Sequence, residues 1–189
     1  VWSGSDNTAE RARALTDNVL HDTADVGPAN KRNMALDATT GQYVMHLDAD
    51  DWLEPGSLKH LVDALDKGAA WAYGSTKYWG KRSDVHVPGP YRRKDFYTGF
   101  PSLYAILRRR DTGIRWRGTE EWRQGIMLPN DYCVALDLIK AGYDGAFVPA
   151  LVLHYLLTDT GLTKAHAAQA DKVNAAIRKY HPEVDWNAA

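Results

Sequence analysis

Cysteine is almost absent from this chain of 189 residues, in which Cys133 is the only one. A single cysteine cannot form an internal disulfide, which excludes a disulfide-stapled secreted scaffold. Long apolar runs are missing as well, since the longest uncharged stretch, residues 145–158, is shorter than the roughly 18 apolar residues of a membrane span. No basic-then-apolar leader opens the chain, so we expect a cytoplasmic protein without a transmembrane segment.

Neither sign of charge dominates, because the net charge is -1, but the charges are unevenly spread. Between Lys77 and Arg123, twelve Lys or Arg stand against five Asp or Glu, an excess of seven positive charges. This excess favours either an anionic ligand or acceptor, or an ordinary solvated surface. The hydrophobic content of 44% excludes a disordered chain, and the length suits one domain over residues 1–189.

Short apolar runs alternate with helical patterns. Helices are expected over residues 8–20, 28–39, 55–66, 130–141 and 163–180, and strands over residues 43–47, 70–73, 103–107, 146–148 and 151–153. This alternation predicts an α/β domain with a mostly parallel sheet flanked by helices. Residues 74–100, rich in Gly, Pro and basic residues, are expected to form a long loop that serves as a lid or a binding surface.

Three carboxylates, Asp48, Asp50 and Asp51, directly follow the apolar run at residues 43–47. In an open parallel sheet the ligand crevice lies beyond the carboxyl ends of the strands, so these acids are expected at a ligand site. Three acids so close together repel one another unless a cation neutralises them, and Mg2+ and Mn2+ prefer carboxylate oxygens. By itself the cluster is a weak signal, and an acidic turn that caps the next helix is its simpler interpretation.

A turn into a helix precedes this cluster at residues 27–33, and it carries Lys31 and Arg32 near the helix start. Free backbone amides at a helix start and the forked guanidinium of Arg32 both suit phosphate oxygens. An exposed basic helix face is the simpler interpretation of either residue alone.

The succession Gly27–Asn33, Ala35-Leu36, Gly41–Val44 and Leu47–Asp51 resembles family 2 inverting glycosyltransferases of the GT-A fold, and the resemblance extends from Val1 to about Thr163. It implies a Rossmann-like sheet flanked by helices with a small acceptor-side subdomain. Residues 1–75 would form the nucleotide-sugar half, and residues 76–189 the acceptor half with the C-terminal helix.

The resemblance also implies the donor and metal ligands. The donor would be a nucleotide diphosphate sugar, and Mn2+ or Mg2+ on its diphosphate would be held by Asp50. Asp48 would bind the ribose or the water shell of the metal, and Arg32 would lie near the nucleotide. His154, which follows an apolar run, would lie near the metal or the diphosphate, although a histidine in such a place is often a core or edge residue.

The catalytic base implied by the resemblance is Asp131, in the segment Pro129–Tyr132, where Asn130 replaces the glutamate of the family's Glu-Asp pair. The helix dipole and free amides near a helix start would stabilise its ionised form. The alternative is that Asn130 or Asp131 only caps the helix. Gly99 resembles the glycine of the loop that borders the sugar and the acceptor.

Two departures from the family pattern concern the first residues. Family members usually begin with a strand and a helix ahead of the segment resembled by residues 1–8, and Trp2 and Ser3 stand where paired aspartates are frequent. We therefore expect a reduced or incomplete base pocket. A phosphatase is disfavoured by Trp52 after the acidic cluster, and a sugar-nucleotide pyrophosphorylase by the lack of a glycine-rich loop.

The predicted activity is a metal-dependent, inverting transfer of one hexose-type sugar from its nucleotide diphosphate to an acceptor hydroxyl. The acceptor is open among glycans, lipid-linked sugars, proteins and nucleic acids. Six aromatic side chains are candidates for stacking on acceptor or base, or else for the core: Trp79, Tyr91, Phe96, Tyr97, Trp116 and Trp122. The alternative function is a non-catalytic nucleotide- or carbohydrate-binding module with a degenerate GT-A fold.

Overall fold

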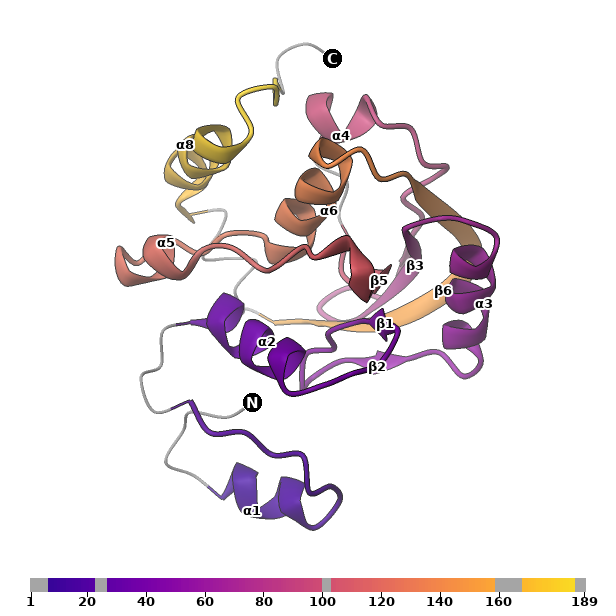
Figure 1. The fold of residues 1–189 in the computed structure, drawn as a ribbon, viewed down its shortest axis with the longest axis vertical. Helices are drawn as coiled ribbons and strands as arrows, with labels where there is room; N and C mark the ends of the chain where they lie inside the picture. The colour runs from indigo at the N-terminus through magenta and orange to yellow at the C-terminus, as the bar shows by residue number, and fades with distance from the viewer. Residues whose placement is uncertain (1–6, 23–26, 100–102, 159–167, 186–189) are drawn as a thin grey trace.

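The computed structural model describes residues 7–22, 27–99, 103–158 and 168–185. Its described strands form one sheet in the order β1-β5-β3-β6-β2, and β4 pairs with β3 beside this path (Figure 1). The strands are β1 (Tyr43–Val44), β2 (Trp52–Leu53), β3 (Trp71–Gly80), β4 (Val85–His86), β5 (Leu107–Arg109) and β6 (Gly145–Leu157).

The sheet is mixed, so the α/β class is confirmed while the expectation of a mostly parallel sheet is wrong. Among the described strands, β3 and β6 pair in parallel, and every other pairing is antiparallel. An apolar run has the same pattern in either chain direction, so periodicity alone could not fix the direction of these strands.

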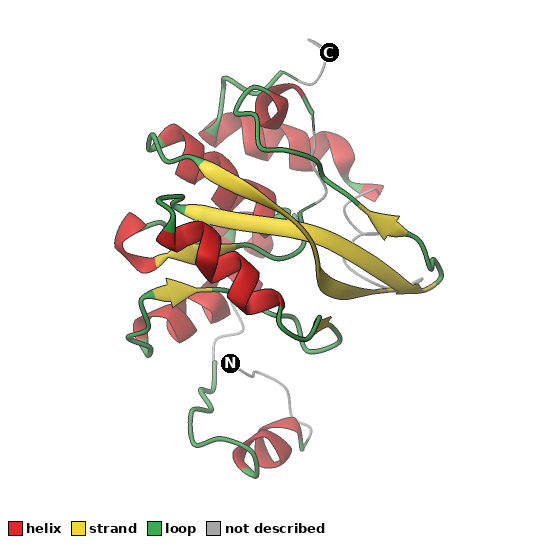
Figure 2. Ribbon diagram, turned by 90° about the vertical axis from the view of Figure 1, so that its right-hand side faces the viewer, coloured by secondary structure: helices red, strands yellow, loops and turns green. Residues whose placement is uncertain are grey.

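Helices cover both faces of the sheet. Helix α3 lies across one face, and α6 lies on the other face with α4 and α8 beyond it (Figures 1 and 2). The helices are α1 (Thr8–Arg13), α2 (Pro28–Asp37), α3 (Ser57–Asp66), α4 (Asp95–Thr98), α5 (Thr119–Arg123), α6 (Asn130–Lys140) and α8 (Ala170–Tyr180), with a 3-10 turn, η1, at Arg110–Thr112.

Each face of the sheet carries its own apolar core. On the α3 face, Leu61 and Leu65 pack against strand residues that include Val152. On the other face, Trp71 of β3 packs in the same cluster as much of α6 and Ile177 of α8. Burial of apolar area at both faces is the main source of stability of such a layered domain.

Two glycines, Gly74 of β3 and Gly145 of β6, allow these strands to pack closely. Residues 74–80 were expected to begin an irregular segment, yet they continue β3 beside β6. A Cβ atom on Gly74 would collide with the Val152 side chain, and one on Gly145 would lie 2.5 Å from Cε2 of Trp71. These glycines permit close packing of the two strands and do not mark turns.

The ends of several other elements differ from the sequence expectation. The first helix stops at Arg13 and, in both ribbon views, lies away from the sheet (Figures 1 and 2). The strands expected at 146–148 and 151–153 are one strand, β6. The last helix is described from Ala170, and residues 163–167 of the expected helix lie outside the described residues.

Candidate active site

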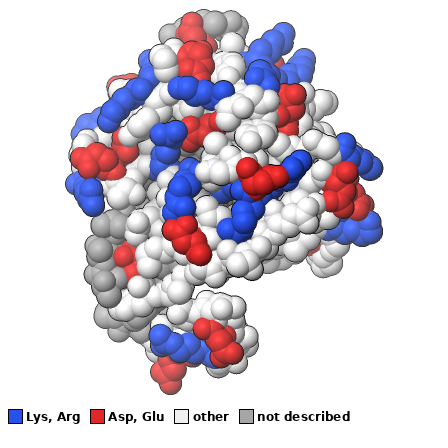
Figure 3. Space-filling view, in the orientation of Figure 1, with Lys and Arg blue, Asp and Glu red and all other residues white. Residues whose placement is uncertain are grey.

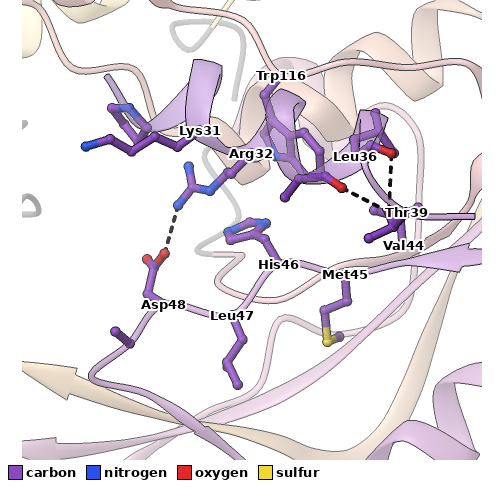
Figure 4. A pocket seen from close by; sticks show the side chains of 13 residues that line it. Lys31, Arg32, Leu36, Thr39, Val44, Met45, His46, Leu47, Asp48 and Trp116 are labelled. Atoms are coloured by element: carbon purple, nitrogen blue, oxygen red, sulfur yellow. Dashed lines mark hydrogen bonds and ion pairs between the residues drawn. The ribbon is translucent and has the colours of Figure 1, made fainter. Parts of the chain in front are cut away.

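A pocket of about 470 Å³ lies between helix α2 and the segment that runs from Val44 to Ala49. Trp116 also lines the pocket, and Lys31 and Arg32 reach it from α2 (Figure 4). The predicted phosphate-binding helix and Asp48, the first acid of the predicted cluster, therefore meet at one cavity.

The start of α2 is fixed by local chemistry. Gly27 has a φ of 92°, a conformation that favours glycine, and a Cβ atom at this position would collide with the indole of Trp122. Pro28 then occupies the first helical turn, where its missing N–H costs no hydrogen bond. These two residues set the direction in which α2 leaves the loop and so place Arg32 over the acidic segment.

Arg32 and Asp48 form an ion pair at the pocket, with Nη2 of Arg32 2.9 Å from Oδ1 of Asp48 (Figure 4). The Arg32 side chain is largely buried and that of Asp48 is about half exposed. A second nitrogen of Arg32, Nη1, is buried without a hydrogen-bond partner among the described residues. The pair thus keeps unused hydrogen-bonding capacity at the pocket.

The remaining two acids of the cluster have different environments. The amide of Leu156 donates a 2.9 Å hydrogen bond to Oδ1 of Asp51, which ties the acidic turn to the end of β6. Burial raises the pKa of the Asp51 carboxyl to about 6, although this hydrogen bond opposes the shift. Asp50 is exposed and forms no hydrogen bond or ion pair with another residue of the described part.

Asp131 lies in the first turn of α6, and a histidine contacts it. The Nε2 atom of His46 is 3.3 Å from Oδ1 of Asp131, and both side chains are mostly buried. His46 also lines the pocket, so the predicted base contacts a residue of the pocket wall.

The suggested capping role is not seen for Asn130. Its amide Nδ2 donates to the carbonyl of Leu128 at 3.2 Å, and no side chain caps the start of α6. The free amides of the first turn therefore remain available to stabilise the carboxylate of Asp131.

His154 lies on β6 beside the acidic turn. Its Nε2 is 2.6 Å from Oε2 of Glu54, and its ring stacks on Trp52 at 4.7 Å. Contact with a metal through Nε2 would require His154 to leave Glu54. The metal role of His154 stays a prediction.

Gly99 ends α4 and is tied to the helix that carries Asp131. The hydroxyl of Tyr132 donates to the carbonyls of Phe96 at 2.5 Å and Gly99 at 3.3 Å. Gly99, in the predicted sugar-side loop, is thus hydrogen-bonded to Tyr132, the residue that follows the predicted base in the sequence.

Two residues of this site, His46 and Asn33, were given no role by the sequence, and Trp116 was only one of six aromatic candidates for stacking or for the core. The backbone N–H and C=O of Trp116 both bond to the Asn33 side chain, at 3.0 and 2.9 Å, which fixes Trp116 against α2. A signal for His46 was present, because alternate residues of an extended segment point to the same side and His46 precedes Asp48 by two. The pairing of Trp116 with Asn33 had no such signal, since it joins distant parts of the chain.

The six aromatic candidates for ligand stacking divide by burial. Phe96 and Trp116 are buried in the core, and Tyr91 and Tyr97 pack against it. Trp79 is exposed and lies 4.9 Å from the Trp52 ring, and Trp122 is half-buried with its indole against Gly27. Most of this set therefore stabilises the fold.

The chemistry of the acidic turn suits a hard divalent cation. Asp50 offers a carboxylate without a protein partner, while Asp48 and Asp51 already have one each. Within the described residues, no group of three or more His, Cys, Asp and Glu is arranged to hold a metal ion. Mg2+ is usually bound by one or two carboxylates together with substrate phosphates and waters, so a single open carboxylate fits this mode.

The comparisons with known proteins concern the same part of the chain. The sequence profile described as Glycosyl transferase family 2 matches residues 1–116, which is more than half of the chain. No curated protein sequence matches significantly. In the described part of the chain, no helix is long and apolar enough to cross a membrane.

Solved structures share the fold at low identity. TarS residues 1–349 of S. aureus, in complex with UDP-GlcNAc, aligns with a TM-score of 0.65 and 15% identity over 85% of this chain and 49% of that chain. The mannosyltransferase PcManGT from Pyrobaculum calidifontis, in complex with GDP-Man and Mn2+, aligns with a TM-score of 0.59 and 20% identity over 92% and 52%. The predicted GT-A fold is confirmed, and the chain spans about half the length of these structures.

Proposed function

Because this chain belongs to glycosyl transferase family 2, we propose that it transfers one sugar from a nucleotide diphosphate sugar to an acceptor hydroxyl with inversion at the anomeric carbon. The observation that carries the proposal is the contact of Asp131, on α6, with His46, which lines the pocket together with Arg32 and Asp48. A base close to a pocket that holds a phosphate-directed arginine is the arrangement that such a displacement needs.

The donor is assigned to the pocket between α2 and residues 44–49. Arg32 lies where its guanidinium can meet nucleotide or phosphate oxygens, and its unpartnered Nη1 favours a ligand there. Asp48, held by Arg32, keeps a free oxygen for a ribose hydroxyl. UDP-GlcNAc and GDP-Man, the ligands of the similar structures, are the first donors to test.

Asp50 would hold Mn2+ or Mg2+ against the diphosphate of the donor. Such an ion supplies positive charge that stabilises the diphosphate as it leaves. The exposure of Asp50 and its lack of a protein partner support this assignment. His154 is a weaker second ligand, because Glu54 already binds its Nε2.

Asp131 acts as the general base in this proposal. It accepts the proton of the acceptor hydroxyl while the acceptor oxygen attacks the anomeric carbon from the face opposite the diphosphate. Gly99, linked to the neighbouring Tyr132, borders the sugar and the acceptor. The acceptor class, the division into nucleotide-sugar and acceptor halves, and the cytoplasmic location stay predictions.

The test is a thermal-shift screen of UDP-, GDP- and TDP-sugars with and without Mn2+, followed by measurement of nucleoside diphosphate release. A donor at about 100 times its Kd stabilises the native state by about 2.7 kcal/mol. For a domain of this size that corresponds to a rise in Tm of roughly 5–10 °C. Binding without release or transfer would favour the binding-module alternative, and no shift with any donor would contradict the proposal.

A further inference from the structure

His46 lines the pocket and also contacts the predicted base. Its Nε2 lies 3.3 Å from Oδ1 of Asp131, and its side chain is only 11% exposed. The same ring lines the donor pocket together with Arg32 and Trp116 (Figure 4). It therefore occupies the boundary between the donor and the base.

The ring of His46 is held in place from behind. Trp116 meets it edge to face, with centroids 5.7 Å apart and planes at 85°. Trp116 is itself fixed by the paired hydrogen bonds to Asn33 and lies under the guanidinium of Arg108 at 4.8 Å. Packing of this kind fixes the orientation of the ring and therefore the position of Nε2. A residue that orients a catalytic group needs to be rigid in this way.

We propose that His46 is a positioning residue that fixes the carboxylate of Asp131 for proton abstraction. This inference rests on the proposed function. With Oδ1 directed at His46, Oδ2 is the oxygen left to face the acceptor. In the transfer, the acceptor oxygen bonds to the anomeric carbon, the bond from that carbon to the diphosphate breaks with its electron pair on the diphosphate, and the acceptor proton moves to Asp131.

The orientation matters because Asp131 has little other support. No side chain caps the start of α6, and Asn130, its neighbour, bonds back to Leu128. Without His46 the carboxylate could rotate, and a misplacement of about 1 Å at a reacting group can lower a rate by about 100-fold.

The test compares His46→Phe, which keeps the ring and its contact with Trp116, with His46→Gln, whose amide reaches the place of Nε2. With the best donor found among UDP-GlcNAc and GDP-Man, and with Mn2+, we expect the Phe variant to lower kcat by about 10- to 100-fold with KM for the donor within about twofold. The Gln variant should recover kcat to within about threefold of the parent. His60→Phe, on the exposed side of α3, is the matched control.

A double-mutant cycle separates positioning from a general structural role. In an Asp131→Asn background, His46→Phe should cause no further loss of the residual rate, because no base remains to be oriented. Equal losses in both backgrounds, or no rescue by Gln, would overturn the inference.

The same double-mutant cycle can be applied to the free energy of unfolding in urea, a measurement that does not depend on turnover. Non-additive effects of His46→Phe and Asp131→Asn on the free energy of unfolding would support the contact, and additive effects would overturn it. A parent protein that releases no nucleoside diphosphate from any donor would contradict the proposed function instead, and His46 would then be judged by the unfolding cycle alone.

Discussion

Three neighbouring aspartates take three different environments in this protein. Asp48 pairs with Arg32, Asp51 accepts a hydrogen bond from the Leu156 amide, and Asp50 stays open to solvent. Their mutual repulsion is thus relieved by an arginine and an amide from two separate elements. The residue left without a partner is the one that resemblance to the family assigns to the metal.

Replacement of the predicted base is the most direct test at this scale. Asp131→Asn keeps the size of the side chain but removes its capacity to accept a proton at neutral pH. We expect donor transfer to fall by roughly 10²- to 10⁴-fold, the usual contribution of a general base, while calorimetric donor binding stays nearly unchanged.

Asp171→Asn is the matched control for Asp131→Asn, because Asp171 also lies in the first turn of a helix, α8, and is exposed. Near-normal turnover of the Asp131 variant would refute its assignment as the base. A loss of the same size in the Asp171 variant would indicate a general effect on folding.

The metal assignment is tested by Asp50→Ala. The loss of its carboxylate should reduce UDP affinity in Mn2+ to the value measured without Mn2+, as determined by isothermal titration calorimetry. Asp63→Ala, at an acid of α3 whose side chain is 43% exposed, should keep the Mn2+ effect. Unchanged Mn2+-dependent binding in the Asp50 variant would exclude Asp50 as the ligand.

At the scale of elements, sequence patterns predicted helices better than strands. Helices α2, α3 and α6 begin and end within about two residues of their expected limits, because Pro, Gly and an apolar period marked their ends. The strands depend on their partners: the pattern from Gly74 onward predicts a loop, although Gly74 is a place where β3 and β6 approach closely. Such packing glycines cannot be told from turn glycines in one sequence.

A buried carboxylate of α6, that of Asp137, contacts His181, the residue that follows α8. The Asp137 side chain is 4% exposed, and it lies 2.6 Å from Nε of Arg117 and 3.4 Å from Nε2 of His181. Burial opposes its ionisation, yet His181 and Arg117 outweigh burial and hold the pKa of Asp137 below its ordinary value. Because α6 also carries Asp131, this tie indirectly supports the site.

The lowered pKa of Asp137 predicts a pH dependence of stability. A depressed folded-state pKa adds stability above the ordinary Asp pKa of about 3.9, and this contribution is lost as the pH falls through the folded value. Asp137→Asn should therefore cost about 3 kcal/mol at pH 7, as expected when one partner of a buried pair is removed. The difference from the parent should shrink below about pH 4.

Urea unfolding between pH 3 and pH 7 measures this difference. Asp63→Asn is the control, because the hydrogen bond from Lys59 also lowers the pKa of the Asp63 carboxyl, but that carboxyl is at the surface. It should change stability little at any pH. A constant difference between Asp137→Asn and the parent over the whole pH range would contradict the expected linkage.

At the scale of the whole molecule, the sequence predicted the candidate site residues better than the contacts between them. The pairing of Arg32 with Asp48 follows from two segments that were both singled out beforehand. The contact of Asp131 with His46 joins residues 85 positions apart, and no periodic pattern reports such a distance. A site assembled from loops and helix starts depends on tertiary packing. Local patterns in a single sequence do not indicate which distant segments pack together.

Most of the arginines in the positively charged segment, residues 77–123, form ion pairs within the fold. Seven of its arginines pair with carboxylates, and blue and red side chains alternate over the surface in Figure 3. The pairs are Arg82–Asp84, Arg92–Asp95, Arg93–Asp144, Arg109–Asp111, Arg115–Asp37, Arg117–Asp137 and Arg123–Glu120. Three of these carboxylates lie outside the segment and offset three of its seven excess charges.

This neutralisation makes a nucleic acid the least favoured acceptor. Arg108 is buried with its guanidinium over the Trp116 ring, and Arg110 donates to the carbonyls of Gly41 and Leu36, so these two cations are also engaged by the fold. We expect a fluorescent single-stranded 12-mer DNA to bind more weakly than about 100 µM at physiological salt, at the weak end of non-specific binding, as measured by anisotropy. Micromolar binding with a steep loss between 50 and 200 mM salt would contradict this expectation, because it would require several of these arginines to leave their carboxylates for phosphates.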